Sequence, residues 1–524
     1  MSPDFPRPRP SVNPWIIAGT VMLATFMEVL DTSVANVSLP HIAGNLSSSV
    51  DEATWVLTSY LVSNAVVLPM SGWFSLLFGR KRFYMTCVLM FTLSSMLCGL
   101  APSLPLLVFF RVLQGLGGGA LQPISQAILV ESFPREKQGM AQAVYGMGVV
   151  FAPVIGPTLG GWITDNYSWR WIFFINIPVG ILSLLMTYAM ITDPPYLAER
   201  RKSGVHIDAI GIGLLTLGLA SLELMLDHGQ KEDWFGSNMI VLAAVLAAFG
   251  LIAVVLWELR KKEPVVDFRM LKDRNFAIAT GAMFLLGFVL YSSTAMLPIF
   301  LQTLLGYNAT TSGEVISPGG IAILFMMPIV GRLVGKVDAR WMIIGGLSVS
   351  SLGLFQMSHF NLDIDFGTAM MARVVQSVGL AFLFIPINVT AFAFVPKEKM
   401  NYATGLVNLA RNIGGSSGIA LSTTLLTRRS QFHQHNLVSH LTPLDANYQA
   451  AMQGLSQTFV QRGADSVQAA NQAQGALYGL LQQQATMRAF VDVFWVLGVV
   501  FLCVIPLVFL MRKVQPHKAP LMVE

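Results

Sequence analysis

Long apolar runs separated by short polar segments fill the chain between residues 15 and 512. A helix needs about 20 apolar residues to cross the hydrocarbon core of a bilayer. Runs of that order cover residues 15–39, 83–100, 104–130, 171–191 and 493–511, among others. The whole series predicts an all-α membrane protein with fourteen transmembrane helices.

The overall composition agrees with a membrane protein. Hydrophobic residues make up 54% of the 524 residues and charged residues only 12%, whereas soluble domains carry about 25% charged residues. Residues 1–14 are polar and rich in proline, and we interpret them as a tail. The apolar run that follows is too long for a signal peptide and lacks a clear cleavage site, so it is predicted to be an uncleaved first helix.

No pattern of reactive side chains indicates catalysis or metal binding. Cys87, Cys98 and Cys503 all fall inside apolar runs, where we interpret them as packing residues. His433 and His435 alone are a weak metal signal. Because no nucleotide-binding motif is found, the sequence predicts neither an enzyme nor a bound cofactor, and a proton gradient is the expected energy source.

Basic residues are distributed unevenly between the loops. If the N-terminus is cytoplasmic, clusters such as Arg80, Lys81 and Arg82 fall in cytoplasmic loops. The basic residues of the loops expected outside are Arg170, Lys231, Arg428, Arg429, Arg462 and Arg488. This asymmetry follows the positive-inside rule and predicts a multi-pass inner-membrane protein with cytoplasmic N- and C-termini. The net charge of +5 therefore does not indicate nucleic acid binding.

An internal repeat relates the two ends of the chain. Five residues recur 262 positions later: Arg111, Gln114, Pro134, Glu136 and Lys137 as Arg373, Gln376, Pro396, Glu398 and Lys399. Ala152 and Gly156 recur at the same offset as Gly414 and Gly418, and Pro69 and Gly72 recur 259 positions later as Pro328 and Gly331. The repeat predicts two parallel six-helix halves, an architecture in which transporters bind substrate between the halves near the middle of the membrane.

The predicted organisation follows from the repeat. Residues 15–195 form an N-terminal six-helix half and residues 276–512 a C-terminal half. Residues 206–259 have no counterpart and are predicted to be an inserted pair of helices, the seventh and eighth. Residues 1–14 and 513–524 are cytoplasmic tails. Residues 428–486 are the one long loop, which is rich in Gln and Ala and is predicted to be periplasmic.

Two acidic residues, Glu28 and Asp31, lie within the first predicted helix. A charge inside a membrane span is costly and is a functional candidate by default. A spacing of three places both carboxylates on one helix face, and two nearby carboxylates in a medium of low dielectric constant do not both ionise easily. The pair is therefore predicted to carry protons, with Asp31 as the first candidate; the alternative is an ion-paired structural strut.

Arg111 is the predicted partner of Asp31. Counted from the outer helix ends at 1.5 Å per residue, both side chains lie about 10–12 Å below the outer surface. An ion pair between them would be released when Asp31 takes up a proton. A purely structural salt bridge is the alternative.

Other polar residues in the spans are candidates for substrate contact or gating. They are Asn36, Gln114, Glu223, Arg373, Gln376 and Arg411. Arg373 has no acidic partner expected in its half, because serines and apolar residues at positions 289–293 stand where the first helix has its acids. Proton chemistry is therefore predicted to concentrate in the N-terminal half. For Glu223 and Arg411 a structural role is equally compatible with the sequence.

A stripe of small residues marks the fifth predicted helix. Gly148, Ala152, Gly156 and Gly160 recur every four residues, with Pro153 and Pro157 between them. Small residues on one face let helices approach closely, and prolines remove internal hydrogen bonds and permit bending. The helix is predicted to form a close-packed, bendable contact.

These segments resemble a known transporter family. Residues 72–82, 111–117 and 148–161 resemble signature motifs of the major facilitator superfamily, and residues 30–40 and 169–180 resemble motifs of its fourteen-helix drug:proton antiporter branch. Within that branch the chain is similar to the inner-membrane subunit of Emr-type tripartite multidrug pumps, on the basis of Asp227, residues 233–235 and 257–259, and the long outer loop. The resemblance covers about residues 15–512.

The resemblance implies a function and a set of roles. The family exports lipophilic drugs in exchange for protons, with a periplasmic membrane-fusion adaptor and an outer-membrane channel as partners. Asp31 would be the coupling acid and Arg111 an arginine of proton transfer. The antiporter motif would comprise Gly148, Pro153, Gly156, Pro157, Gly160 and Gly161.

One departure from the family pattern concerns the loop after the second helix. Leu76 and Leu77 stand where the family usually has an aspartate and an arginine. The cytoplasmic charge lock between helices is therefore expected to be weaker or differently built.

The substrate is not specified by the sequence. The main prediction is export of lipophilic drugs or toxic small organic compounds; the alternatives are a dedicated exporter of a fatty acid, siderophore or other metabolite, and a non-transporting sensor or scaffold. Buried acids argue against the last, because a scaffold does not need them. The long loop is predicted to dock the adaptor, with a solvated loop of no function as the alternative.

Overall fold

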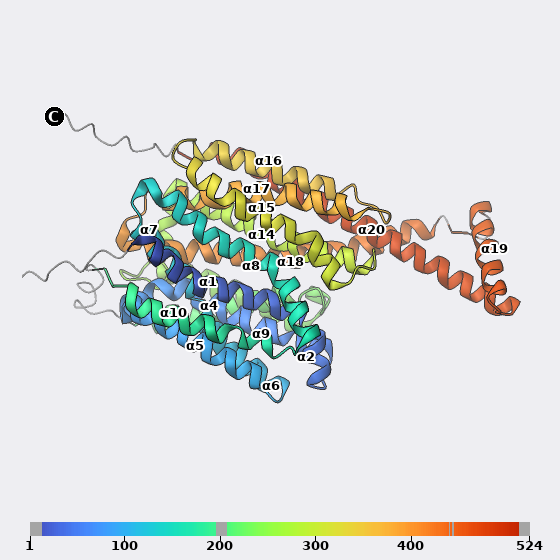
Figure 1. The fold of residues 1–524 in the computed structure, drawn as a ribbon, viewed down its shortest axis with the longest axis horizontal. Coiled ribbons are helices and arrows are strands. Elements are labelled where there is room, and N and C mark those ends of the chain that lie inside the picture. The colour runs from blue at the N-terminus through green and yellow to red at the C-terminus, as the bar shows by residue number, and fades with distance from the viewer. Residues whose placement is uncertain (1–12, 195–206, 440, 443–444, 513–524) are drawn as a thin grey trace, which may run out of the picture.

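The computed structural model describes residues 13–194, 207–439, 441–442 and 445–512. The helices lie side by side in an elongated bundle, and α19 with part of α20 projects from one end (Figure 1). Apart from residues 13 and 14, the two tails predicted from the sequence lie outside the described residues.

The N-terminal half contains six membrane-length segments. They are α1 (Pro14–Val37), α4 (Trp55–Phe78), α5 (Arg80–Leu100), α6 with α7 (Leu104–Gly118 and Leu121–Ser132), α8 (Gln138–Asn166), and α9 with α10 (Trp171–Phe174 and Asn176–Met190). Two short helices, α2 (Leu39–Asn45) and α3 (Val50–Ala53), join α1 to α4. The sequence predicts α6 and α7 as one helix; the structure breaks it at Gly119 and Ala120, directly after Gly117 and Gly118, because glycine disfavours a continuous helix.

The C-terminal half repeats this arrangement. Its helices are α14 (Arg274–Thr303), α15 (Ala309–Leu333), α16 (Ala339–Met357), α17 (Phe366–Phe392), α18 (Met400–Val438) and α20 (Ser466–Phe509). Five of them begin at a residue whose side-chain oxygen accepts a backbone N–H of the first turn: Asp273, Asn308, Asp338, Asp365 and Asp465. Such caps satisfy donors that the helix itself leaves unpaired and fix where each helix begins.

The inserted pair consists of α12 (Ala209–His228) and α13 (Asn238–Glu258). The two helices touch at Gly218 and Gly250, where a Cβ on Gly218 would lie only 2.8 Å from Leu251 N. Helix α12 also packs against α4 of the N-terminal half and α18 of the C-terminal half. The insert therefore contacts both halves at once.

The segment predicted as a long loop, residues 428–486, is mostly helical. Helix α18 continues through it to Val438, α20 already begins at Ser466, and α19 (Ala446–Gln461) lies at the tip (Figure 1). We call residues 428–486 the arm. Its two long helices are joined by Gln434 Nε2, which donates to Tyr478 Oη at 2.9 Å, and at the base His433 pairs with Asp492 at 2.7 Å. Gln and Ala favour helix, and α18 and α20 extend into the arm without interruption.

The structure does not confirm the predicted number of membrane spans. Twelve of the described helical segments are long and apolar enough to cross a membrane. Helices α16 and α18, the predicted eleventh and thirteenth spans, do not meet this composition limit. Helix α16 contains Arg340 in its first turn and serines in its middle, and α18 is rich in Asn, Thr, Gln and Arg. The structure thus shows an all-helical, multi-pass membrane fold, and the count of fourteen is not confirmed.

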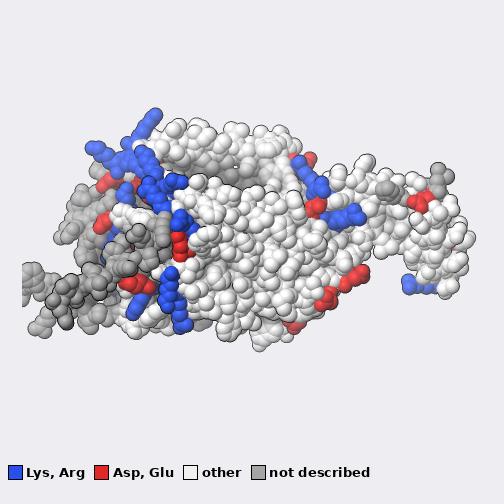
Figure 2. Space-filling view, turned by 90° about the horizontal axis from the view of Figure 1, so that it is seen from above, with Lys and Arg blue, Asp and Glu red and all other residues white. Residues whose placement is uncertain are grey.

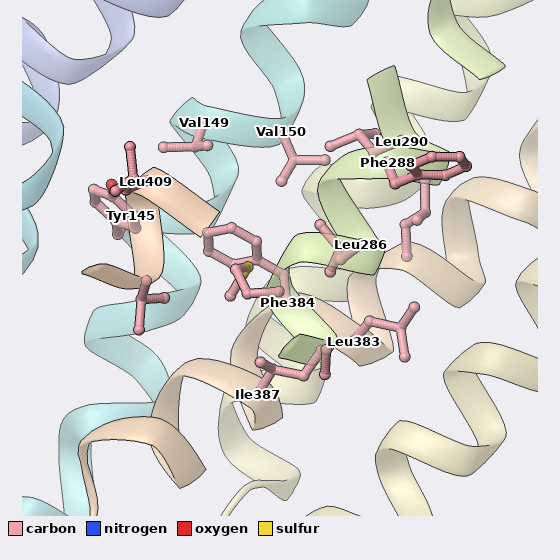
Figure 3. Packing of buried hydrophobic residues seen from close by; sticks show 14 of the residues in the cluster. Tyr145, Val149, Val150, Leu286, Phe288, Leu290, Leu383, Phe384, Ile387 and Leu409 are labelled. Atoms are coloured by element: carbon pink, nitrogen blue, oxygen red, sulfur yellow. The ribbon is translucent and has the colours of Figure 1, made fainter. Parts of the chain in front are cut away.

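The two halves meet along a seam formed by equivalent helices. Helix α8 packs along α15, and α4 packs against α18. A Cβ on Gly139 would lie 2.6 Å from Gly331 O, and a Cβ on Gly72 would lie 3.0 Å from Tyr402 N. Figure 3 shows apolar side chains of both halves in contact, with the rings of Tyr145 and Phe384 stacked 6.1 Å apart. At these glycines the backbones of the two halves pack directly against each other.

Charged residues mark the ends of the bundle. Figure 2 shows most Lys and Arg side chains of the viewed face at the end where α1 begins and α20 ends. At this end Arg80 Nη1 and Nη2 donate to the two carboxylate oxygens of Glu131 at 2.9 and 2.8 Å. Lys399 Nζ lies 2.7 Å from Asp267. A two-pronged pair thus joins α5 to α7 near the position where Leu76 and Leu77 replace the family's usual charges.

Candidate functional site

Asp31 lies buried in the second half of α1 and is held by three donor side chains from two other helices, α6 and α10. Arg111 Nη1 lies 2.5 Å from Asp31 Oδ2. Gln114 Nε2 donates to Asp31 Oδ1 at 3.0 Å, and Asn176 Nδ2 donates to the same oxygen at 2.7 Å. The ion pair predicted from helix depth is therefore confirmed as a contact. Charge-assisted hydrogen bonds of this kind are about twice as strong as neutral ones.

Close helix packing places Arg111 at this depth. Helix α6 approaches α4 and α5 through glycines: a Cβ on Gly115 would lie 2.5 Å from Tyr60 O, and one on Gly117 would lie 2.7 Å from Phe91 N. Arg111, one turn earlier, is fully buried and its Nε donates to Val56 O at 2.9 Å. Its guanidinium carbon lies 4.2 Å from the centre of the Tyr60 ring. The Val56 carbonyl and the Tyr60 ring thus hold the Arg111 side chain in the position from which it binds Asp31.

Glu28 has its own, separate set of partners. Tyr60 Oη and Asn64 Nδ2 donate to Glu28 Oε1 at 3.2 and 3.0 Å, and Gln122 Nε2 donates to Oε2 at 2.5 Å. The sequence predicts that Glu28 and Asp31, two nearby carboxylates on one helix face, do not both ionise easily. The structure instead gives each acid its own donors, and Tyr60 lies between the two groups because its ring contacts Arg111 while its hydroxyl contacts Glu28.

The C-terminal half contains the same arrangement without the acid. Arg373 Nη1 donates to Gln376 Oε1 at 2.7 Å and to Ser293 Oγ at 3.2 Å, and Gln376 Nε2 donates to Ser293 Oγ at 2.8 Å. Ser293 stands 262 positions after Asp31, the offset of the repeat. Arg373 Nη2 also donates to Thr294 at 2.8 Å. Within the described residues, the hydrogen-bond partners of Arg373 are thus all uncharged side chains.

Arg411 of α18 reaches across the seam into the N-terminal half. Its Nη2 donates to Gln122 Oε1, and Gln122 in turn donates to Glu28. Among the described residues no carboxylate lies within 4.0 Å of Arg411, and its Nε has no hydrogen-bond partner. Glu28, Gln122 and Arg411 therefore form one chain from α1 through α7 to α18.

The small-residue stripe of α8 faces α1. A Cβ on Gly148, Gly156 or Gly160 would clash with Met22, Ser33 or Val34, respectively, whereas Gly161 has only an ordinary contact at 3.9 Å. Pro157 has no N–H to donate to the Pro153 carbonyl one turn earlier. Ser33 Oγ donates to that carbonyl at 3.1 Å instead. The bend-permitting prolines and the glycines thus serve one contact, between α8 and the helix that carries both acids.

The insert carries the remaining candidate, Glu223. This residue is buried in α12 and hydrogen-bonds to Ser416 of α18. One turn further along α12, Asp227 accepts a hydrogen bond from Thr58 of α4. Trp234 Nε1, beyond the end of α12, donates to Thr424 Oγ1 of α18 at 3.0 Å. The insert is thereby bonded to both halves, which places Glu223 at the seam and apart from Asp31.

Some residues of these networks were not predicted, and one predicted residue lies outside them. Gln122, Asn64, Tyr60 and Asn176 are buried in the structure. The sequence signal that could have found them is a polar side chain inside a predicted span. Asn36 is exposed near the end of α1 and makes no contact with either acid's network.

Comparisons with known proteins agree with the fold. The family model described as Major Facilitator Superfamily matches residues 21–419. The multidrug export protein EmrB of Escherichia coli K12 is 35% identical over 497 residues, which cover 94% of both chains. The fatty acid resistance protein FarB of Neisseria gonorrhoeae is 36% identical over 515 residues, which cover 97% of this chain and 98% of FarB.

A solved structure shares the architecture at low sequence identity. The proton:xylose symporter XylE, a major facilitator protein, superposes with a TM-score of 0.62 and 14% identity over 96% of this chain and 97% of XylE. At that identity the likeness shows the fold alone. The long match to the family and the identity to EmrB and FarB over nearly the whole chain show more: this protein belongs to the Major Facilitator Superfamily.

Proposed function

We propose that the protein exports lipophilic drugs or other toxic small organic compounds across the bacterial inner membrane in exchange for protons. The observation that carries this proposal is the buried Asp31–Arg111 pair in the N-terminal half, whose counterpart in the C-terminal half has a serine, Ser293, in place of the acid. A scaffold has no need of a buried acid, whereas a proton carrier needs one. Similarity to EmrB over 94% of the chain supports drug export.

The coupling step follows from the contacts of Asp31. As a carboxylate, Asp31 binds Arg111, Gln114 and Asn176 and holds α1 against α6 and α10. A proton removes the charge and weakens the bond to Arg111. Helix α1 is then freer to move against α8 along the glycine stripe. Substrate release and proton uptake can alternate through this one acid as the halves rock about the seam.

In the proposed topology all fourteen long helical segments cross the membrane and both termini are cytoplasmic. Helix α16 packs against α17 and α20, and α18 packs against α14, α20 and α4, so polar residues such as Ser350, Ser351 and Arg411 are buried between helices. The Lys- and Arg-rich end of the bundle in Figure 2 would be the cytoplasmic end. The arm at the opposite end would then be periplasmic.

The arm is the proposed docking site for a periplasmic membrane-fusion adaptor, which would lead on to an outer-membrane channel. Its helices have few buried apolar residues: α19 has none, and the arm portion of α20 buries mainly Ala469, Ala473 and Leu481. A segment with so little core of its own can be stabilised by binding a partner.

Export of a fatty acid is the second candidate. FarB, a fatty acid resistance protein, is as similar to this chain as EmrB is. A buried Arg411 with an unpartnered Nε at the seam would suit a carboxylate.

A flux assay separates these functions. The purified protein is placed in proteoliposomes with a pH-sensitive dye inside, and tetraphenylphosphonium or oleate is added. Drug export predicts proton movement with tetraphenylphosphonium, and fatty acid export predicts it with oleate. If neither these probes nor a wider panel of lipophilic cations and anions moves protons, the proposal of proton-coupled export is wrong.

A further inference from the structure

The chain Glu28–Gln122–Arg411 joins the two halves through a single uncharged side chain. Gln122 Nε2 donates to Glu28 Oε2 at 2.5 Å, and Gln122 Oε1 accepts from Arg411 Nη2. An amide has one donor end and one acceptor end. Its donor end faces the acid and its acceptor end faces the cation, so the orientation of Gln122 is set by the two charges together.

We propose that Gln122 is a positioning residue that couples the charge on Glu28 in the N-terminal half to Arg411 in the C-terminal half. When Glu28 loses its negative charge, Gln122 loses the interaction that orients it, and its hold on Arg411 across the seam weakens. This inference rests on the proposed proton-coupled function and gives Glu28 a role distinct from that of Asp31.

The contacts of Glu28 explain why its charge matters to Gln122. All three of its partners, Tyr60, Asn64 and Gln122, donate to it, so the pocket is built for a carboxylate. If a proton sits on Oε2, two donors face each other and the Gln122 amide must turn, which points its N–H groups at Arg411. If the proton sits on Oε1, the bond from Gln122 loses its charge assistance and about half its strength.

The other groups that face Glu28 do not replace Gln122. Arg411 from α18, Tyr60 from α4, Tyr145 from α8 and Tyr291 from α14 are the charged or titratable side chains that interact with Glu28 from other helices. Among them Arg411 is the cation, and in the described residues its bonded route to Glu28 runs through Gln122.

On the same helix as Glu28, Asp31 is already engaged by Arg111. That pair lies in the other network, beyond the Tyr60 ring. The hydrogen-bonded route from Glu28 to Arg411 therefore does not pass through the Asp31–Arg111 pair.

A substrate-free distance measurement tests the coupling. Spin labels on Asn166→Cys and Gln302→Cys, at exposed ends of α8 and α14, report the separation of the halves in detergent; the variant Cys503→Ser removes the exposed native thiol. The ratio of the two distance populations is measured between pH 5.5 and 8.5. In the otherwise unchanged protein the ratio is expected to shift with pH, and Glu28→Gln at pH 8.5 should resemble the parent at low pH.

Gln122→Met then decides the proposal. In the parent, Glu28→Gln should change the population ratio by at least about twofold at pH 8.5, the lower end of the coupling found between residues in direct contact. With Gln122→Met already present, adding Glu28→Gln or Arg411→Gln should change it less than about twofold. Gln376→Met is the matched control, a buried arginine-bound glutamine in the C-terminal half, and there Glu28→Gln should keep its full effect.

The results that would contradict the role of Gln122 differ from those that would contradict the proposed function. The proposal fails if the parent ratio does not depend on pH, or if Glu28→Gln has the same effect with and without Gln122→Met. Should Gln122→Met not fold, Gln122→Asn, whose shorter amide cannot reach both partners, takes its place. Proton-coupled transport by the parent in proteoliposomes is measured separately, and its absence would overturn the proposed function whatever the distances show.

Discussion

The Gln126 amide nitrogen donates to Asn388 Oδ1 at 2.7 Å, and these two residues stand 262 positions apart, the offset of the internal repeat. Equivalent residues of two related halves touch only where the axis that relates the halves passes between them. Asn408 Nδ2 donates to Gln126 Oε1 at 2.7 Å, and Tyr145 Oη donates to Asn408 Oδ1 at 3.2 Å. The middle of the molecule is therefore a polar, hydrogen-bonded contact between the halves.

This contact predicts a measurable cost when one amide is removed. Gln126→Leu leaves Asn388 Oδ1 without its donor in a fully buried place, which costs about 1–3 kcal/mol. Thermal unfolding in detergent should show a lower melting temperature. Replacing both partners, in Gln126→Leu with Asn388→Leu, should cost less than the sum of the single changes; strict additivity would mean that the bond is not formed.

Arg111 is predicted to tolerate no loss of charge. Arg111→Ala leaves Asp31 buried without its cation, and breaking a buried ion pair costs about 3–5 kcal/mol. Export should be abolished and the melting temperature lowered. Arg111→Lys keeps the charge but loses the fork that binds Val56 O and Asp31 together, so it should be partly active.

Arg373 provides the matched comparison for Arg111. Its partners are uncharged, so Arg373→Lys should leave the pH dependence of export as in the parent, while Arg111→Lys alters it. The measurement is the export rate in proteoliposomes between pH 6 and pH 8. Equal changes in both variants would argue against a special role for the N-terminal pair.

The α1–α8 contact is predicted to be intolerant of a single methyl group at one position. A Cβ on Gly156 would clash with Ser33 and disturb the hydrogen bond from Ser33 to the Pro153 carbonyl. Gly156→Ala should therefore reduce export at least about tenfold, the effect of a barrier change of about 1.4 kcal/mol. Gly19→Ala is the control on α1, because no atom lies within 4 Å of its Cβ. Comparable losses in both variants would show that the packing is not responsible.

The arm is predicted to matter in cells and not in vesicles. Replacing residues 440–473 by a short glycine-serine linker removes α19 and the distal part of α20 but keeps the Gln434–Tyr478 contact. Because only delivery beyond the inner membrane needs an adaptor, cellular resistance should be lost while export in proteoliposomes persists. Loss of both activities would instead place the arm in the transport cycle.

Charge and depth allowed part of the site to be predicted from the sequence. Asp31 and Arg111 are both charged, and their positions along their helices put them at one depth, so the pair could be derived without a structure. The repeat likewise predicts the two halves. It also explains why Arg373 is bonded to Ser293, which stands at the position equivalent to Asp31.

The remaining contacts depend on packing that no local pattern specifies. An amide such as Gln122 can bond to any polar neighbour, and its partner Arg411 comes from the other half, 289 residues away. The separation of Glu28 from the Asp31 network depends on where Tyr60 of α4 lies. The Gln- and Ala-rich composition of the arm favours helix, but few large apolar residues mark a buried face there, so the sequence does not show that α18 and α20 continue into it.

The central claim, that Asp31 carries the coupled proton, is tested most directly by uphill transport in proteoliposomes. Asp31→Asn keeps the size of the side chain, but its amide does not take up or release a proton in the pH range of the assay. With an imposed pH gradient, the parent should accumulate tetraphenylphosphonium, or oleate if that is the substrate, against its concentration gradient. Asp31→Asn should fold and still bind the probe but accumulate none, and Glu28→Gln should change only the rate or the range of substrates. Uphill accumulation by Asp31→Asn at the rate of the parent would contradict the account.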